Sequence, residues 1–453
     1  MHSTNRDRLL ALIGENDLII VPSATMTTRN DDVEFPFRQD STFRWLTGFD
    51  EPDAIAVLAP GHHDGAYQLF VNPRDPDAEA WTGYRAGTEG AKERFGADEA
   101  YEVGTFSSKL KSLVHGRERL WYSLGGRLDD TIIKTVTEMR QFGDRWGVPV
   151  VELADVAGPV GELRLRKTPA EMELMARAAE LSGDAHIRAT EVAAPGVHEY
   201  QVQAEMEALW FGAGATDNGY PPIVASGPNA CILHYVENRR LMEDGDLLLI
   251  DAACEVDGYG ADITRTFPIN GVFSAPQRAI YDVVLTAEVA GIEKAVPGNT
   301  FKDINEAAIG VVTEGLVDLG LIPGPVDRAL SMHHYRTFLF HGIGHWLGLD
   351  VHDSGRYRLN GDHRPLEEGM VFTVEPGIYV ADDKGEITLE MREYDIDAEM
   401  KSRMLGEKVE KPDDIEEITH QVPEEFLGIG VRIEDDIAIT PDGHRNLSKS
   451  VPV

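Results

Sequence analysis

The sequence predicts an α+β protein in which an N-terminal α/β domain precedes a larger domain built on an antiparallel sheet. In residues 1–155, short apolar runs alternate with helical patterns, which is typical of a sheet with helices between its strands. In residues 156–453, the strand-like runs come in adjacent pairs, and long helical patterns cluster before and between these pairs. Adjacent pairs indicate hairpins rather than βαβ units, so we expect the larger sheet to be antiparallel.

The charge composition of the chain excludes some classes of binding partner. The chain has 453 residues, with 78 acidic against 42 basic residues and a net charge of −36. Such a surface repels nucleic acids and anionic membranes, so neither is an expected partner. The cysteines, Cys231 and Cys254, provide no disulfide framework and suit a reducing compartment. No signal-peptide pattern and no apolar run of ~18 residues is found, and we therefore expect a cytoplasmic protein.

The N-terminal domain is expected to begin with a helix near residues 5–13. Strands are predicted at residues 17–21, 54–58, 67–71, 120–122 and 148–151. The aromatic-rich run at residues 35–52 fits either core plus loop or a rim that touches substrate or a neighbouring subunit. Residues 155–167 are interpreted as a linker or connecting strand.

Helix start signals organise the second domain. Thr168 and Ser274 are N-cap candidates with Glu171 and Gln277 at the capping-box position, and Thr300 is a third cap. Helices are predicted over residues 168–192, 198–211, 274–295 and 300–319, and strands over residues 222–225 and 247–251. Residues 381–425 are rich in charged residues and poor in aromatics, so we expect an exposed, partly helical acidic insertion there.

The stretch LLLIDAACEVDGYGADITRT, residues 247–266, carries the first chemical signal. Its two apolar runs flank a turn signal at Asp257-Gly258, which predicts a hairpin. Asp251 and Asp262 lie at nearly equal distances from this turn, so an even loop would place both on one face. Two such charges about 4 Å apart repel by roughly 4 kcal/mol at an effective dielectric of about 20. Either positive charge lies between them or both are ordinary surface acids on a solvated hairpin.

Three later segments carry charged or imidazole groups in similar surroundings. They are HGIGHWLGLDVHD (341–353) with His341, His345 and His352, VFTVEPGIYV (371–380) with Glu375, and GVRIEDDIAIT (430–440) with Arg432 and Glu434. Carboxylates inside apolar strands are rarely buried without partners. Arginines, protonation or metal ions could compensate Asp251, Asp262, Glu375 and Glu434, but Arg265 and Arg432 do not balance four acids. We therefore predict two divalent cations.

The predicted ligand set is mostly oxygen, with one imidazole. Such a set favours manganese, cobalt or iron over a structural zinc, which prefers cysteine and histidine. Manganese is the expected ion, with cobalt, iron or zinc as alternatives. Because a pair of divalent cations activates water near neutral pH, hydrolysis is the predicted reaction class.

Taken together, these residues resemble the M24 metallopeptidases of the pita-bread fold, and specifically the Xaa-Pro aminopeptidases. The resemblance covers most of the chain and rests on FRQDSTFRWLTGFDEPDA (37–54), ILHYVEN (232–238), DAACEVDGYGADITRTFP (251–268), HGIGHWLGLDVHD, VEPGIY (374–379) and VRIEDD (431–436). It implies a creatinase-like N-terminal α/β domain and a C-terminal pita-bread domain, in which helices flank a curved antiparallel sheet.

The resemblance also implies five metal ligands. Asp251 would be a terminal ligand, Asp262 and Glu434 would bridge the ions, and His345 would bind through its imidazole. Glu375 would be a ligand that also relays a proton.

Other roles in the substrate site are implied in the same way. His234 and His352 would hold the scissile carbonyl and the tetrahedral intermediate, so that with Glu375 they form the expected catalytic set. Arg432 and Tyr379 would belong to the supporting hydrogen-bond network, and His341 would lie beside the cleft.

Plainer interpretations remain for several of these residues. His234, next to Tyr235, also fits a satisfied core histidine, and Tyr379 fits plain strand packing. His333 and His334 are interpreted as surface or core residues without a role. Asp435 and Asp436 are expected to be solvated acids at a loop or sheet edge.

The resemblance implies hydrolysis of the Xaa-Pro bond at peptide N-termini. This bond is a tertiary amide without an N–H, so a peptidase that aligns substrate through that donor fails on it, whereas a dimetal site acts on the carbonyl. Prolidase, the Xaa-Pro dipeptidase, resembles the same motifs and is the nearest alternative. A non-catalytic peptide-binding pita-bread module and metal-free creatinase are disfavoured because all five ligands are present, and methionine aminopeptidase lacks such an N-terminal domain.

Two departures from the family pattern bear on these expectations. The first ligand motif usually reads Asp-Ala-Gly, and here it reads Asp251-Ala252-Ala253. The acidic insertion lengthens the spacing between Glu375 and Glu434, and an insertion folded over the cleft would restrict substrate length. The family is often dimeric or tetrameric, so a homo-oligomer is expected.

Overall fold

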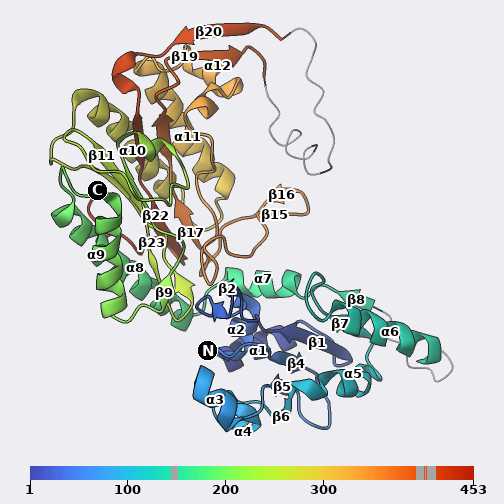
Figure 1. The fold of residues 1–453 in the computed structure, drawn as a ribbon. Helices are drawn as coiled ribbons and strands as arrows, with labels where there is room; N and C mark the ends of the chain where they lie inside the picture. The colour runs from blue at the N-terminus through green and yellow to red at the C-terminus, as the bar shows by residue number, and fades with distance from the viewer. Residues whose placement is uncertain (144–151, 394–401, 403–404, 406–414) are drawn as a thin grey trace. The chain divides into compact units, whose positions relative to one another are not determined.

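A computed structural model describes residues 1–143, 152–393, 402, 405 and 415–453. The chain divides into two compact units, Met1–Arg164 and Leu165–Val453. Among the described residues, every helix is too short or too polar to cross a lipid bilayer. Figure 1 shows the elements of each unit.

The first unit is built on a six-stranded mixed sheet. Its strand order is β6-β5-β4-β1-β7-β8, with β1–β4 and β4–β5 antiparallel and the other pairs parallel. The strands are β1 Asp17–Pro22, β2 Thr28–Asn30, β3 Val33–Glu34, β4 Ile55–Leu58, β5 Tyr67–Val71, β6 Glu99–Glu102, β7 Arg119–Trp121 and β8 Glu152–Ala154. The helices are α1 His2–Leu10, α2 Ser41–Thr47, α3 Pro76–Thr82, α4 Gly87–Glu93, α5 Phe106–Val114, α6 Asp129–Gly143 and α7 Ala157–Leu165.

Most strands predicted for this unit are confirmed, because their apolar runs are buried in the sheet. The strand predicted at residues 148–151 lies outside the described residues. The interpretation of residues 155–167 as a linker or connecting strand is wrong, since α7 occupies most of this stretch. Val160 and Leu165 of this helix are buried, so apolar side chains anchor it.

The second unit contains all the residues predicted for the site. Its helices are α8 Pro169–Val192, α9 Glu199–Gly212, α10 Ala275–Glu293, α11 Phe301–Asp318 and α12 Val326–Ser331. Its strands are β9 Asp217–Asn218, β10 Ile223–Ser226, β11 Leu247–Asp251, β12 Cys254–Val256, β13 Tyr259–Gly260, β14 Thr264–Pro268, β15 Arg358–Leu359, β16 Asp362–His363, β17 Val371–Val374, β18 Gly377–Val380, β19 Glu386–Glu390, β20 Glu417–Gln421, β21 Ile429–Arg432, β22 Asp435–Thr440 and β23 Gly443–Asn446. Within the described residues, all strand pairs of this unit are antiparallel, as predicted.

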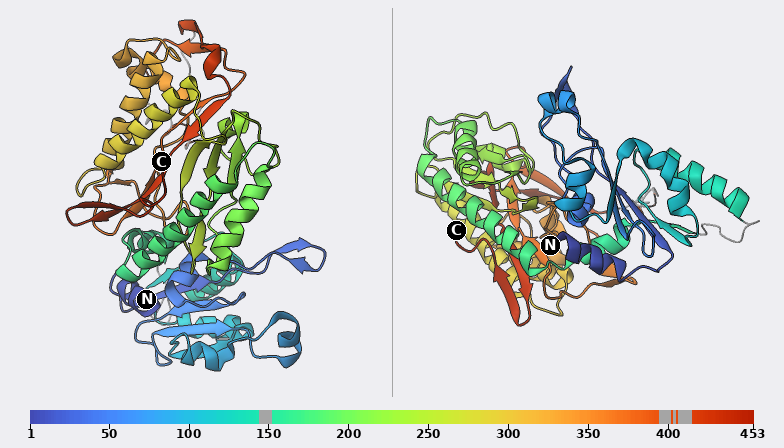
Figure 2. Two further views of the ribbon diagram at one scale, coloured as in Figure 1. Left: turned by 90° about the vertical axis from the view of Figure 1, so that its left-hand side faces the viewer. Right: turned by 90° about the horizontal axis from the view of Figure 1, so that it is seen from below.

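The helices begin where the capping signals predict. The side chains of Thr168, Ser274 and Thr300 each accept a hydrogen bond from the backbone N–H three residues later, and each completes a capping box. Figures 1 and 2 show two helix pairs beside the strands of this unit. The α8–α9 pair packs on β10, β12 and β13, and α10 packs on β17, β18 and β21. Each pair buries its own apolar cluster, so the α+β fold with helices flanking antiparallel strands is confirmed.

The predicted hairpin at residues 247–266 exists, but it has two tiers. In the wider tier β11 pairs with β14 and Asp251 lies opposite Thr264. In the narrower tier β12 pairs with β13 around the turn at Asp257-Gly258. Asp262 lies between the tiers, diagonally across from Asp251, so both acids are near one another.

The ends of the predicted acidic insertion form a two-stranded ribbon. β19 and β20 pair antiparallel from Glu386–Gln421 to Glu390–Glu417. At these ends the structure shows strands, in which alternating apolar residues such as Ile387 and Leu389 are buried against the core. Most of the middle of the insertion lies outside the described residues.

Candidate metal centre

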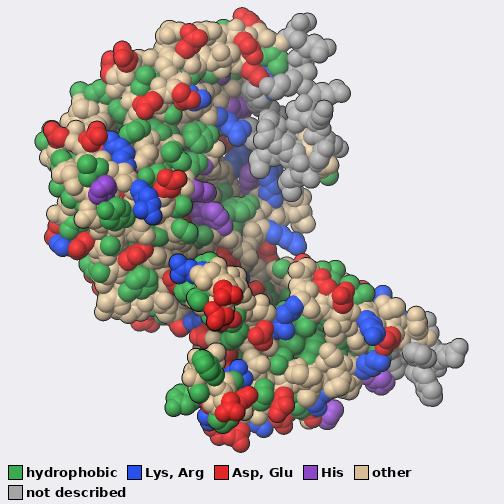
Figure 3. Space-filling model, in the orientation of Figure 1, with side chains coloured by type: hydrophobic (Ala, Val, Ile, Leu, Met, Phe, Trp, Pro, Cys, Tyr) green, Lys and Arg blue, Asp and Glu red, His purple; other side chains and the backbone are tan. Residues whose placement is uncertain are grey.

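A cavity of about 580 Å³ opens in the second unit where the two halves of the sheet meet. Its lining includes every predicted ligand: Asp251, Asp262, His345, Glu375 and Glu434. The predicted substrate residues His234, His341, His352 and Arg432 also line it. Figure 3 shows histidine side chains gathered at a hollow in the surface.

The acids reach the cavity from strand ends rather than from strand centres. Asp251 ends β11, and Asp262 lies two residues before the start of β14. Glu375 lies between β17 and β18, and Glu434 lies between β21 and β22. An antiparallel bridge between Thr264 and Glu434 joins the two halves of the sheet at this point. Acids distant in the sequence therefore meet where each strand stops pairing regularly.

The loop that carries His345 approaches strand β17 closely. A Cβ atom on Gly344 would lie 1.9 Å from the backbone oxygen of Thr373, so this position requires glycine. The backbone N–H of His345 donates to Thr373 Oγ1 at 3.1 Å. Its Nδ1 lies 3.1 Å from the Trp346 oxygen, which fixes the ring and leaves Nε2 toward the acids.

The distances describe a compact ligand set. His345 Nε2 lies 3.4 Å from Asp262 Oδ2 and 3.5 Å from Glu375 Oε1. One ligand atom each from Asp262, His345 and Glu434 lies within 4.8 Å of the others. The structure therefore brings four carboxylates and one imidazole to one cavity, as the sequence predicts.

Arg432 is the main cation beside these acids. Its Nη2 donates to Asp251 Oδ2, its Nη1 donates to Tyr379 OH at 2.9 Å, and its Nε donates to Thr264 Oγ1 at 3.2 Å. Tyr379 OH in turn lies 2.8 Å from His341 Nε2. Tyr379 is thus part of a hydrogen-bond network and is more than strand packing.

The pKa values report uncompensated negative charge. Burial, together with the charge of Asp262, raises the pKa of Asp251 despite Arg432. Burial and the charges of Asp262, Glu375 and Asp251 raise the pKa of Glu434 well above its usual range. Burial also raises the pKa of Glu375 to about 7. One arginine does not neutralise this group of acids.

Histidines around the cavity differ in their charge. Burial would lower the pKa of His345, but hydrogen bonding and charge from Asp262, with the charge of Glu375, raise it to about 9. Burial and the nearby Arg432 lower the pKa of His341 to about 4. His234 and His352 are exposed at the cavity, so the interpretation of His234 as a core histidine is wrong.

The donor set fits divalent metal ions. Asp251 Oδ1 is buried and accepts no well-formed hydrogen bond from a described residue. A cation among Asp251, Asp262, His345, Glu375 and Glu434 would relieve both this orphaned oxygen and the mutual repulsion of the acids. Carboxylate oxygens with one imidazole suit first-row divalent ions.

Two further buried acids directly follow Glu434 in the sequence. Asp435 and Asp436 are 5% and 1% exposed, so the prediction that they are solvated acids is wrong. Arg265 Nη2 donates to Asp435 Oδ1 at 2.7 Å, and both carboxylate oxygens of Asp436 accept from the backbone N–H of Asp262. Asp436 therefore supports the segment that carries a predicted ligand.

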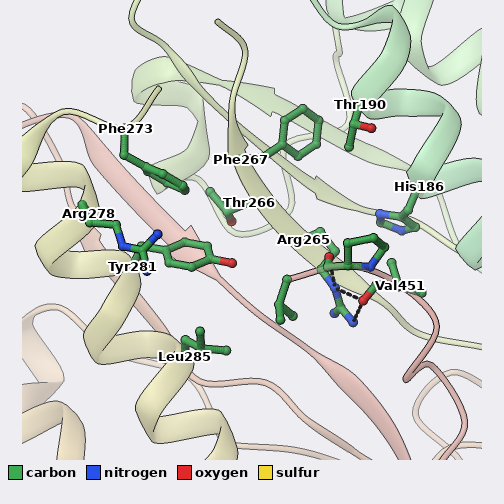
Figure 4. A pocket seen from close by; sticks show the side chains of 12 residues that line it. His186, Thr190, Arg265, Thr266, Phe267, Phe273, Arg278, Tyr281, Leu285 and Val451 are labelled. Carbon is green, nitrogen blue, oxygen red and sulfur yellow. Dashed lines mark hydrogen bonds between the residues drawn. The ribbon is translucent and has the colours of Figure 1, made fainter. Parts of the chain in front are cut away.

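Arg265 joins several segments behind the cavity. Its guanidinium donates to the backbone oxygens of Glu434, Val451 and Pro452. Figure 4 shows this arginine beside the C-terminal residues in a separate pocket of about 220 Å³. The C-terminal tail is thus fastened to the strands that carry Asp262 and Glu434.

Several supporting residues escaped the sequence analysis. Thr264 Oγ1 donates to Glu434 Oε2 at 2.6 Å, and Tyr220 lines the cavity. Burial and the charges of Asp251, Asp262 and Glu434 raise the pKa of Tyr220 well above its usual range. Thr264 could have been found as the residue two positions after Asp262, on the same strand face, but Tyr220 carries no signal of this kind.

The fold and this cluster of acids define a metal-dependent hydrolase. The sequence pattern of metallopeptidase family M24 matches residues 173–441, and the aminopeptidase P N-terminal domain matches residues 2–121. This chain belongs to metallopeptidase family M24, whose members bind divalent metal ions. The family prediction is confirmed.

Relatives and solved structures agree with this assignment. The chain is 39% identical to an Xaa-Pro aminopeptidase of Haemophilus influenzae, over 99% of this chain and 93% of the relative. It is 37% identical to the Xaa-Pro aminopeptidase of Escherichia coli, over 98% and 93%. A solved aminopeptidase of Pseudomonas aeruginosa superposes with a TM-score of 0.89 at 42% identity, covering 100% of this chain and 95% of that one.

Proposed function

We propose that this protein is a metal-dependent aminopeptidase that hydrolyses the Xaa-Pro bond at the N-termini of peptides. The observation that carries the proposal is one cavity that holds four carboxylates, three of them buried, together with one imidazole and with exposed histidines at its edge. The full-length likeness to Xaa-Pro aminopeptidases supports the choice of bond.

Asp251, Asp262, His345, Glu375 and Glu434 would hold two divalent ions. When bound, these ions supply Lewis acidity that activates a water molecule and polarises the scissile carbonyl. Arg432 keeps Asp251 in place through its Nη2, while Thr264 orients Glu434.

Glu375 would hold and release a proton during the reaction. Its carboxylate lies at the cavity wall, with Oε2 3.7 Å from His341 Nδ1. A carboxylate in this position is suited to accept a proton from the attacking water and to return it later in the reaction. His234 and His352, exposed at the cavity, would donate hydrogen bonds to the scissile carbonyl and to the tetrahedral intermediate.

The remaining lining is apolar and suits a proline ring. Pro221, Ile223, Leu233, Val236 and Val351 face the cavity. A proline ring buried there would leave no amide N–H without a partner, because the Xaa-Pro amide has none. A substrate with an ordinary amide at this bond would bury an unpaired donor.

The decisive assay compares substrates with matched chemistry. The chelator-stripped protein is tested with Arg-Pro-Pro and Arg-Pro, before and after manganese is restored. Manganese-dependent release of arginine from Arg-Pro-Pro is expected, and Glu375→Ala should abolish it. Cleavage confined to Arg-Pro would identify a dipeptidase, and binding without cleavage would identify a non-catalytic module.

Manganese is the proposed native ion because the ligand set is rich in oxygen. A zinc-substituted form of the Escherichia coli aminopeptidase P has been solved in complex with product, so other ions can occupy a related site. Activity restored by zinc and not by manganese would contradict this choice.

We also expect a cytoplasmic homo-oligomer that does not bind nucleic acid. Trp81 and Tyr84 are each 90% exposed in the first unit, which is unusual for aromatics of this size and favours a protein contact there. Light scattering should give a mass above that of one chain, and replacing both aromatics by serine should lower it.

A further inference from the structure

One buried carboxylate lies outside the metal centre and has no part in the proposed reaction. Glu199 occupies the first turn of α9 and is 0% exposed. Its side chain accepts five hydrogen bonds, all from residues 226–240. Oε1 accepts from Ser226 N at 2.8 Å, Ser226 Oγ at 2.7 Å and Asn229 Nδ2 at 3.2 Å. Oε2 accepts from Tyr235 OH and Arg240 N, both at 2.8 Å.

The segment that Glu199 holds forms one wall of the cavity. Leu233, His234 and Val236 belong to this segment and line the cavity. His234 is exposed there and directly precedes Tyr235, a donor to Glu199. The Glu199 carboxylate therefore holds the backbone segment at Tyr235, one residue from His234, which faces the cavity.

This segment has few apolar anchors of its own. Of residues 227–240, Ala230 and Asn238 are the buried ones, while Ile232 and Val236 are 53% and 51% exposed. Cys231, Leu233 and Tyr235 are only partly buried against the neighbouring apolar cluster, so polar contacts must supply the rest of the segment's support.

Helix α9 makes further hydrogen bonds to the C-terminal end of this segment. Asn238 adopts a φ of 50° and donates through Nδ2 to Gln203 Oε1 at 2.9 Å. The backbone N–H of Glu199 also donates to the Arg240 oxygen at 3.1 Å. Helix α9 thus holds the segment on both sides of Tyr235.

We propose that Glu199 is a positioning residue that sets the place of His234 in the substrate site. The inference rests on the proposed function, because it assigns Glu199 a role through a histidine of that site. A glutamine in its place would keep the shape but lose acceptor capacity, and its NH₂ group would face donors. The segment would then relax, and His234 would leave its place at the cavity.

The test compares Glu199→Gln with Glu205→Gln, which makes the same change at an exposed position of the same helix. With Arg-Pro-Pro and saturating manganese, E199Q should lower kcat/KM roughly tenfold or more, whereas E205Q should match the unmodified chain. The manganese affinity, measured by titration calorimetry, should stay unchanged in both. If manganese affinity in E199Q fell by as large a factor as kcat/KM, the proposal would be overturned in favour of a general structural role.

A double-mutant cycle identifies the route of the effect. If Glu199 acts through His234, E199Q should cost little further kcat/KM in a His234→Ala background. Additive losses would overturn the proposal. Should E199Q not fold, Tyr235→Phe removes one of the five bonds, and a roughly threefold loss that disappears in the H234A background is expected. An unchanged kcat/KM in Y235F would contradict the proposal.

The unmodified chain and E205Q separate the two hypotheses. If both fail to cleave Arg-Pro-Pro, the proposed function fails regardless of Glu199. If both cleave it and E199Q cleaves it equally well, the proposed function stands and the inference about Glu199 fails.

Discussion

Glu434 and Asp435 are neighbours in the sequence, both are buried, and they lie in opposite electrostatic surroundings. Glu434 faces the cavity, where burial and three other acids raise its pKa well above the usual range. Asp435 faces the back of the sheet. There burial works against its charge, but Arg265, Ser448 and Asn446 more than offset it and lower the pKa. One residue along a strand therefore separates an uncompensated acid from a fully compensated one.

This contrast shows that burial alone does not mark a metal ligand. Both residues are at most 5% exposed. What distinguishes Glu434 is the shortage of positive charge and hydrogen-bond donors around it. A group of acids that the protein leaves uncompensated is a site prepared for cations, whereas Asp435 is part of the scaffold.

The largest expected effect tests Glu434, on the side of the sheet that faces the cavity. Glu434→Gln removes a carboxylate from the ligand set, so manganese content should fall and kcat/KM for Arg-Pro-Pro should drop about a thousandfold, ~4 kcal/mol of transition-state stabilisation. Metal analysis and steady-state kinetics measure both. Glu424→Gln, an exposed position, is the matched control. Full metal content in E434Q would remove Glu434 from the ligand set.

The next effect tests Asp435, which pairs with Arg265 on the side of the sheet away from the cavity. Asp435→Asn leaves Arg265 buried with a weaker partner and should destabilise the metal-free protein by about 3 kcal/mol. In the same denaturant experiment, E434Q should be neutral or stabilising, because it removes one of several repelling acids. If both variants lost the same amount of unfolding free energy, the contrast between Glu434 and Asp435 would not hold.

The pH dependence should differ between the metal-free and loaded proteins. Glu375 has its pKa raised from 4.5 to about 7, and His345 from 6.5 to about 9. Both bind protons more tightly when folded, so the metal-free protein should lose stability as the pH rises from 4.5 to about 9.

Metal binding needs these groups deprotonated, so the metal-induced gain in Tm should grow over the same pH range. Calorimetry of both forms measures this divergence. Glu375→Gln should flatten the lower part of the metal-free curve. A metal-induced gain that is constant with pH would contradict the assignment of both groups as ligands.

The smallest effect concerns the support of Asp435. Ser448 is fully buried, and its Oγ donates to Asp435 Oδ1 at 2.7 Å. Ser448→Ala should lower the free energy of unfolding by about 1 kcal/mol and leave the manganese affinity unchanged. A fall in manganese affinity comparable with that of E434Q would show that the metal site at Glu434 and the charged group around Asp435 are coupled.

Local signals predicted the elements of this protein well. The capping residues Thr168, Ser274 and Thr300 marked helix starts correctly, because capping depends on residues within one turn. The stretch that became α7 was misread, since only its packing shows which residues are buried. The ribbon at the ends of the insertion was not predicted for a related reason: β19 and β20 pair across a long sequence separation.

The site was predicted as a set of residues but not as an arrangement. Asp251, Asp262, Glu375 and Glu434 stood out because charged residues interrupt apolar runs. The same reasoning gave no way to see that Asp435 pairs with Arg265 near the C-terminal tail, or that Asp436 accepts hydrogen bonds from the backbone of Asp262. Glu199 was missed because a glutamate in the first turn of a helix looks like an ordinary surface residue.

The sequence by itself determined which groups can bind metal and which segments form helices and strands, since both depend on residue type and local spacing. The tertiary structure alone decided which buried acids remain uncompensated. Compensation depends on which donors and cations arrive from distant segments, as Arg265 does for Asp435, and electrostatic energy depends on distances in space rather than along the chain.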